Sequence, residues 1–137
     1  MKIEVVSGQP HANINDFFTN LLRQNNVDVD GVSSKNYLVF PEQNHTHQQI
    51  LFDTVREIVA TYIDRDEDLY ILTYSDHVFN AVRVEIKKHK LDNCVLHQIL
   101  QNGTDECARI DNDGHLSHWA NGVFDTWDNA LTELLTS

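Results

Sequence analysis

Two short, almost wholly apolar runs, each followed by an amphipathic helical pattern, constrain the fold of this chain more than any other feature. The runs are Tyr37–Phe40 and Leu69–Thr73. Runs of this kind are typical of strands that are buried on both faces, as in a parallel sheet. Because parallel strands need a crossover connection, usually a helix, the alternation predicts an α/β domain with a mainly parallel sheet flanked by helices in a three-layer-like arrangement.

The rest of the chain extends this unit at both ends. We expect one domain over residues 1–137, and its charged and apolar content is that of an ordinary globular protein. Periodicity and turn signals predict strands at 2–6, 94–100 and 107–110, with the last two forming an antiparallel end. They predict helices beginning at Asn13, over 47–64, after an N-cap at Ser75, and over 126–135, and a turn at 111–114.

The chain is strongly acidic, with 10 basic and 21 acidic residues and a formal net charge of −11. This charge disfavours direct binding to nucleic acid or to an anionic membrane. It suits a basic protein surface or imitation of nucleic-acid charge, and simple solubility is the plainer interpretation. The acids that mimicry would use lie mostly in predicted turns: Asp28, Asp30, Asp64, Asp66, Glu67, Asp68, Asp105, Glu106, Asp111, Asp113, Asp125 and Asp128.

The cysteines and the apolar segments bear on the compartment. Cys94 and Cys107 are too few for a disulfide scaffold and lack the spacing of a zinc motif, so we expect reduced thiols in the cytoplasm. Cys94 lies within an apolar strand pattern, which favours burial over reactivity. We expect no signal peptide and no membrane-spanning segment, because no window approaches about 18 apolar residues.

Three segments, in order along the chain, carry a family resemblance. They are LVFPEQNHTHQQ (38–49), LTYSDHVFNAVR (72–83) and IDNDGHLSHWANGVFDTWDNALTELL (110–135). They resemble, in turn, the Walker B and D-loop region, the switch-histidine region and a C-terminal signature of SMC-like ABC ATPases related to the OLD nucleases. The resemblance implies that residues 37–137 form half of an ABC ATPase head, preceded by a divergent strand–helix segment at 1–36.

The departures from the family pattern remove most of what ATP hydrolysis requires. Residues 7–13, SGQPHAN, lack the lysine and second glycine of a phosphate-binding loop. Val39 or Phe40 stands where the family has a magnesium-holding acid, and Tyr74 stands where it has the switch histidine. Glu42 matches the water-orienting glutamate. We therefore expect a non-catalytic protein without a cofactor, in which Glu42 and Tyr74 are vestigial.

Other matched positions are candidates for binding a partner protein. His45 and His47 with Glu42 nearby can also be drawn as a metal site, but loop packing is the simpler interpretation and we expect no metal. Trp119, Phe124 and Trp127 either plug the end of the sheet or form an exposed aromatic anchor. The possible partner-binding residues are His45, His47, Asp76, His77, Trp119, Phe124 and Trp127.

Three functions are compatible with these features. The first is an interaction protein, such as a phage-type inhibitor or decoy that binds an SMC-like or OLD-like ATPase of a defence or DNA-handling complex in the host cytoplasm. The second is an acidic DNA mimic, and the third is one subunit of a split ATPase with Glu42 as its base. A sheet without its other half also exposes an edge or a face, which self-association or the segment before Tyr37 would cover; we expect a homodimer.

Overall fold

The computed structural model describes residues 1–9, 12–25, 27, 36–40, 48–120 and 123. Glu42, His45, His47, Phe124, Trp127 and the predicted C-terminal helix lie outside the described residues. The described elements are β1 (Ile3–Gly8), α1 (Ile14–Gln24), β2 (Tyr37–Phe40), α2 (Gln48–Asp64), β3 (Leu69–Thr73), α3 (Asp76–His89), β4 (Cys94–Ile99) and β5 (Ala108–Ile110).

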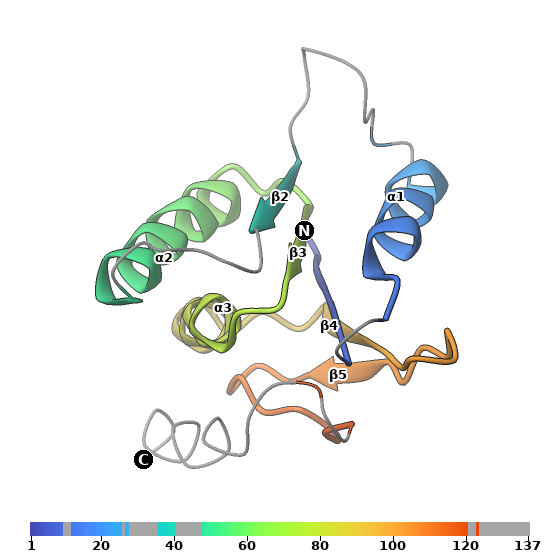
Figure 1. Ribbon diagram of the computed structural model, residues 1–137. Helices are drawn as coiled ribbons and strands as arrows, with labels where there is room; N and C mark the ends of the chain where they lie inside the picture. Colours follow the sequence, from blue (N-terminus) through green and yellow to red (C-terminus); the bar gives the residue numbers. More distant parts are fainter. Residues whose placement is uncertain (10–11, 26, 28–35, 41–47, 121–122, 124–137) are drawn as a thin grey trace.

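The strands form one five-stranded sheet in the order β2-β3-β1-β4-β5. The first four are parallel to one another, and β5 runs antiparallel to β4. Figure 1 shows α1 on one face of this sheet and α2 with α3 on the other. The predicted α/β fold with a mainly parallel sheet and an antiparallel end is confirmed.

The N-terminal strand lies at the centre of the sheet, between β3 and β4. It is also longer than predicted, because Ser7 and Gly8 continue the pairing with Gln98 and Ile99 of β4. Ile3 and Val5 contribute to the core beneath α2 and α3, and Val6 contributes to a second core beneath α1. The segment before residue 37 and the segment after it therefore share one sheet and both cores.

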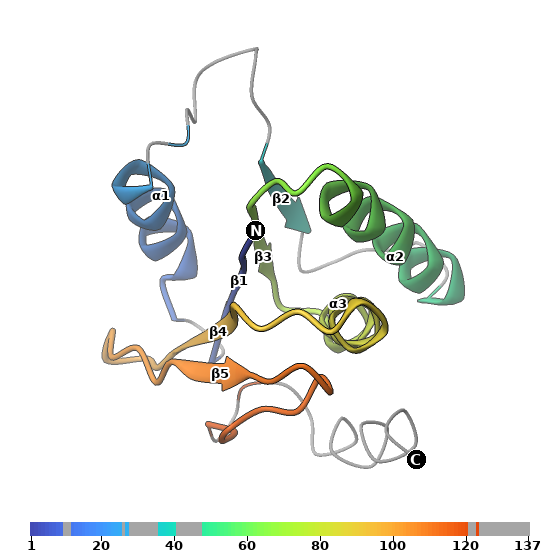
Figure 2. The same cartoon turned by 180° about the vertical axis from the view of Figure 1, so that it is seen from behind.

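The prediction that Tyr37–Phe40 is buried on both faces is wrong. Among the described strands β2 pairs only with β3, so it is an edge strand, and the side chain of Val39 is 52% exposed. Tyr37 still packs under α1 with Phe18, with ring centroids 6.4 Å apart. Figure 2 shows that β2 lies at the margin of the sheet, where one edge of the strand has no neighbour among the described elements.

The local signals at the helix ends behave as expected. Ser75 accepts a hydrogen bond from the Val78 amide and caps α3, and Asn13 caps α1 through the amide of Asp16. Asp111 begins the predicted turn, which Gly114 completes with a φ of 81°. No helix of the described residues is long and apolar enough to cross a membrane.

Candidate functional site

The carboxyl ends of parallel strands are where α/β proteins place their binding sites. In this chain the loop after β1 and the segment after β3 meet at that edge. Tyr74, Asp76 and His77, three of the residues singled out in the sequence, directly follow β3. The structure therefore brings them to the expected edge of the sheet.

The unit β1–loop–α1 has the strand–loop–helix order of a phosphate-binding loop. Counting GxxxxGK[ST] from Gly8 puts Asn13, Ile14 and Asn15 at the second glycine, lysine and hydroxyl positions. Ile14 is only 2% exposed. A Cβ atom on Gly8 would lie 2.7 Å from Ile14 Cγ2 and 2.7 Å from the Ile99 carbonyl oxygen. A packed aliphatic side chain thus stands where a lysine would reach the phosphates.

Three backbone amides in the described part of this loop are already used. The Gln9 amide donates to the Ile99 carbonyl at 2.9 Å, the Ala12 amide to the Gln9 carbonyl at 3.0 Å, and the Ile14 amide to the Ala12 carbonyl at 3.0 Å. In a phosphate-binding loop such amides point at the anion instead. These three donors are committed to the protein itself.

The first turn of α1 is equally unsuited to an anion. The Asp16 amide donates to the Asn13 side-chain oxygen at 3.3 Å, and the Asn13 side-chain amide donates to the Asp16 carboxylate at 2.8 Å. Asp16 therefore brings a negative charge to the helix end that would otherwise attract a phosphate.

Tyr74, the residue after β3, contacts the loop that follows β1. Its hydroxyl donates a hydrogen bond of 3.1 Å to the carbonyl oxygen of Ala12. Tyr74, which the sequence resemblance aligns with a switch histidine, thus joins the end of β3 to the loop after β1.

The other described candidates are Asp76, His77 and Trp119. Asp76 and His77 form a surface pair at 3.6 Å in the first turn of α3. Trp119 packs edge-to-face on Phe79, with ring centroids 6.0 Å apart, and the Arg83 guanidinium lies 5.2 Å from its ring. Trp119 is therefore part of the packing against α3.

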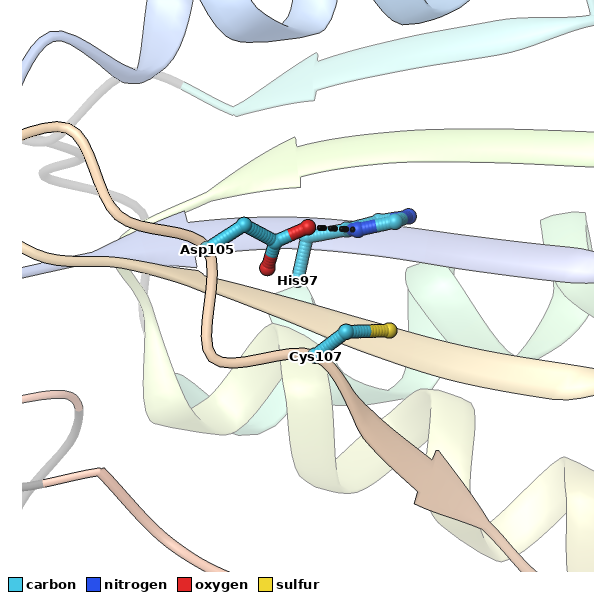
Figure 3. Close-up of side chains that lie close together, drawn as sticks. All are labelled: His97, Asp105 and Cys107. Atoms are coloured by element: carbon cyan, nitrogen blue, oxygen red, sulfur yellow. Dashed lines mark hydrogen bonds and ion pairs between the residues drawn. The ribbon is translucent and has the colours of Figure 1, made fainter.

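A second cluster, which the sequence reasoning missed, lies on the face of the sheet that carries α1. It comprises Glu4 of β1, His97 of β4, and Asp105 and Cys107 of the segment leading to β5; below it is called the His97 cluster. His97 Nδ1 lies 2.8 Å from an Asp105 oxygen and His97 Nε2 lies 2.9 Å from a Glu4 oxygen. Figure 3 shows the Asp105 carboxylate directed at the near nitrogen of the imidazole, with the Cys107 side chain on the adjoining segment beside them.

The electrostatics of the His97 cluster follow from its partners. Burial, the largest single influence, lowers the pKa of His97, but the hydrogen bonds and charges of Asp105 and Glu4 together outweigh it and raise that pKa to about 9. The hydrogen bond from His97 is the main cause that lowers the pKa of Glu4, against its burial. Partial burial of the sulfur, together with the nearby charges of Asp105 and Glu4, raises the pKa of the Cys107 thiol.

A turn signal in the sequence leads to this cluster. Asn102-Gly103 is a strong hairpin dipeptide, and it lies between the two strands predicted at 94–100 and 107–110. The observed register pairs Leu96 with Ala108, and an isolated bridge joins Ile99 to Asp105. Continuing that register sets Cys107 opposite His97, on the same face.

A hollow of about 360 Å³ between α2 and α3 contains charges of both signs. Two of its residues are already paired: Arg56 Nε donates to the buried Glu85 carboxylate at 2.9 Å. This pair joins the two helices and leaves the hollow without a clear preference for either charge. Its lining residues are Asp53, Arg56, Glu57, Ala60, Glu85 and Lys88.

Comparison of the chain with protein-family models, with curated proteins and with solved structures finds no match. The resemblance to SMC-like ABC ATPases consequently stays a prediction from the three sequence segments.

Proposed function

We propose that this chain is a non-catalytic interaction protein on the scaffold of an ABC-type ATPase head, and that it binds a protein partner of the SMC-like or OLD-like ATPase class as an inhibitor or decoy. The observation that carries the non-catalytic part is the loop between β1 and α1. Its described amides on Gln9, Ala12 and Ile14 bond to the protein itself, Ile14 stands at the counted lysine position, and Tyr74 bonds the loop to the end of β3. Each of these features opposes a bound nucleotide.

The edge strand β2 supports the binding part of the proposal. Among the described strands it pairs with β3 alone, and Val39 on it is exposed. An unpaired strand edge offers backbone donors and acceptors to an added strand of a partner. In the family resemblance this strand carries the Walker B motif, so a decoy would present the same element as the ATPase it imitates.

Imitation of DNA has less support, because several of the acids are engaged within the fold. Asp66 pairs with the N-terminal amino group at 3.0 Å, and Asp68 accepts from the Lys2 amide at 2.8 Å. Asp113 pairs with Lys90 at 2.7 Å, and Asp105 is bonded to His97. A DNA mimic needs carboxylates that are free to meet a basic groove.

The experiment is capture of purified SMC-like and OLD-like ATPases by the immobilised chain at several salt concentrations. We expect one such ATPase to bind and its hydrolysis rate to change. Val39→Lys places a charge on the edge of β2 and is expected to weaken capture by about 10-fold or more. Thr104→Lys makes the same charge change in the exposed turn before β5, at the opposite end of the sheet, and should leave capture intact.

Two outcomes would count against the proposal. Capture of none of these ATPases at any salt concentration contradicts the partner class. Equal loss with Val39→Lys and Thr104→Lys contradicts β2 as the contact, because the loss then follows from charge alone.

Light scattering on the same variants tests the homodimer. In a homodimer β2 would pair with β2 of a second copy, and Val39→Lys would give monomers.

A further inference from the structure

The His97 cluster brings together three of the side-chain types that proteins use to bind zinc: an imidazole, a carboxylate and a thiol. Their ligand atoms on His97, Asp105 and Cys107 all lie within 4.8 Å of one another. All three come from one hairpin, so a single local register positions them. We propose that His97, Asp105 and Cys107 form a divalent transition-metal site of the zinc class, with Glu4 as the outer carboxylate that orients the histidine.

The ligand set suits zinc or cobalt and not magnesium or calcium. Thiolate, imidazole and carboxylate together match the preferences of Zn²⁺, whereas Mg²⁺ and Ca²⁺ take oxygen ligands. Tetrahedral zinc bonds place the ligand atoms about 3.3–3.6 Å apart, so the 2.8 Å contact between His97 Nδ1 and Asp105 widens on binding and the thiol sulfur moves inward. Cys107 belongs to an exposed segment and can make this adjustment.

Glu4 has the position that an outer partner of a metal-bound histidine requires. It accepts from His97 Nε2 at 2.9 Å, which leaves Nδ1, the atom that faces Asp105, for the metal. Ligating histidines almost always hold their second nitrogen in this way. Lys2 Nζ in turn lies 3.4 Å from Glu4 and keeps that carboxylate in place.

Two further observations fit a ligand at this place. One carboxylate oxygen of Asp105, Oδ1, is shielded from solvent and has no hydrogen-bond partner. Phe17 of α1 packs against the imidazole with ring centroids 5.1 Å apart, so the ring is held from the side of the helix. His97 is 11% exposed, whereas Cys107 is exposed, which leaves solvent access on the thiol side.

Binding is an exchange of protons for the metal. Zn²⁺ displaces the Nδ1 proton of His97 and the thiol proton of Cys107 to the buffer, while the Asp105 carboxylate exchanges its hydrogen bond to Nδ1 for the metal. A water molecule completes a four-coordinate sphere, as is usual where only three protein ligands are available. The site thus goes beyond the proposed partner binding and does not depend on it.

The test is titration of the whole chain, first freed of metal with a chelator, with Co²⁺ and then with Zn²⁺ in competition. We expect one ion per chain, a thiolate-to-cobalt charge-transfer band, and displacement by Zn²⁺. Cys107→Ser should abolish the band and weaken binding by about 100-fold or more, and Asp105→Asn should weaken it similarly. Glu4→Gln should keep the band and weaken binding by about 10–100-fold.

Cys94→Ala is the matched control, because Cys94 is the second cysteine and is buried on the opposite face of β4. It should leave the band unchanged. No charge-transfer band in the wild type, or a band that persists in Cys107→Ser, would overturn the proposal. Circular dichroism of each variant shows that lost binding does not follow from lost folding, and the exposed position of Cys107 makes Cys107→Ser the safest variant.

Discussion

At the scale of single residues, the charge of His97 couples the stability of the fold to pH. In metal-free protein its folded pKa is about 9, above the unfolded value of 6.5. The stabilisation is therefore fully present below pH 6.5 and is lost as the pH rises towards 9, because the folded state holds its proton longer. We expect a loss on the order of 2–3 kcal/mol across this range.

The measurement is urea unfolding of chelated wild type and His97→Gln at several pH values. The difference between the two proteins should shrink as the pH rises from 6.5 to 9.5. Comparing them removes the contribution of the N-terminal amino group, whose pKa is raised by its hydrogen bond to Asp66. A difference that stays constant with pH would show that His97 is not held charged by Glu4 and Asp105.

At Gly114 both the backbone conformation and close packing against α3 oppose a larger side chain. Its φ is 81°, and a Cβ there would lie 2.9 Å from the Arg83 carbonyl oxygen of α3. Gly103 has a similar φ of 88° but nothing within 4 Å of a Cβ. We expect Gly103→Ala to cost about 1 kcal/mol from backbone strain alone, and Gly114→Ala about 2–4 kcal/mol because the clash is added.

Thermal or urea unfolding of both glycine variants checks this. The pair is matched in backbone conformation, so the difference between them measures the approach of the 111–114 turn to α3. Equal losses of unfolding free energy in the two variants would mean that the turn can move away from Arg83 without destabilising the fold.

At the scale of elements, the connection between β3 and the loop after β1 depends on Tyr74. Tyr74→Phe removes the hydroxyl that bonds the Ala12 carbonyl and should cost about 1 kcal/mol. It should also speed hydrogen exchange of the Ala12 amide, whose partner Gln9 lies in the same loop. Unchanged exchange at Ala12 would show that Tyr74 does not hold the loop.

The sequence was informative about elements and less so about their neighbours. Apolar runs and helical periodicity predicted β2, β3, α2 and α3, because those signals are local. Whether the Val39 side chain is covered depends on which strands and helices lie beside β2. A four-residue apolar run does not indicate which elements those are. The central place of β1 is likewise a long-range property of the sheet.

The same contrast between local signals and long-range contacts separates the two candidate sites. Tyr74 was found because its motif and its strand end are adjacent in sequence. The His97 cluster depends on the register of the β4–β5 pair and on Glu4, which is 93 residues from His97. The Asn102-Gly103 dipeptide signals a turn there but not that register, because a two-residue loop would not pair Leu96 with Ala108.

At the scale of the whole molecule, the central claim is that a strand–loop–helix unit suited by topology to a nucleotide is closed by its own side chains and amides. Isothermal titration of the intact chain with MgATP tests this most directly. We expect no saturable heat up to millimolar MgATP, in wild type and in Tyr74→Phe alike. Saturable binding of one MgATP per chain by the wild type would contradict the central claim.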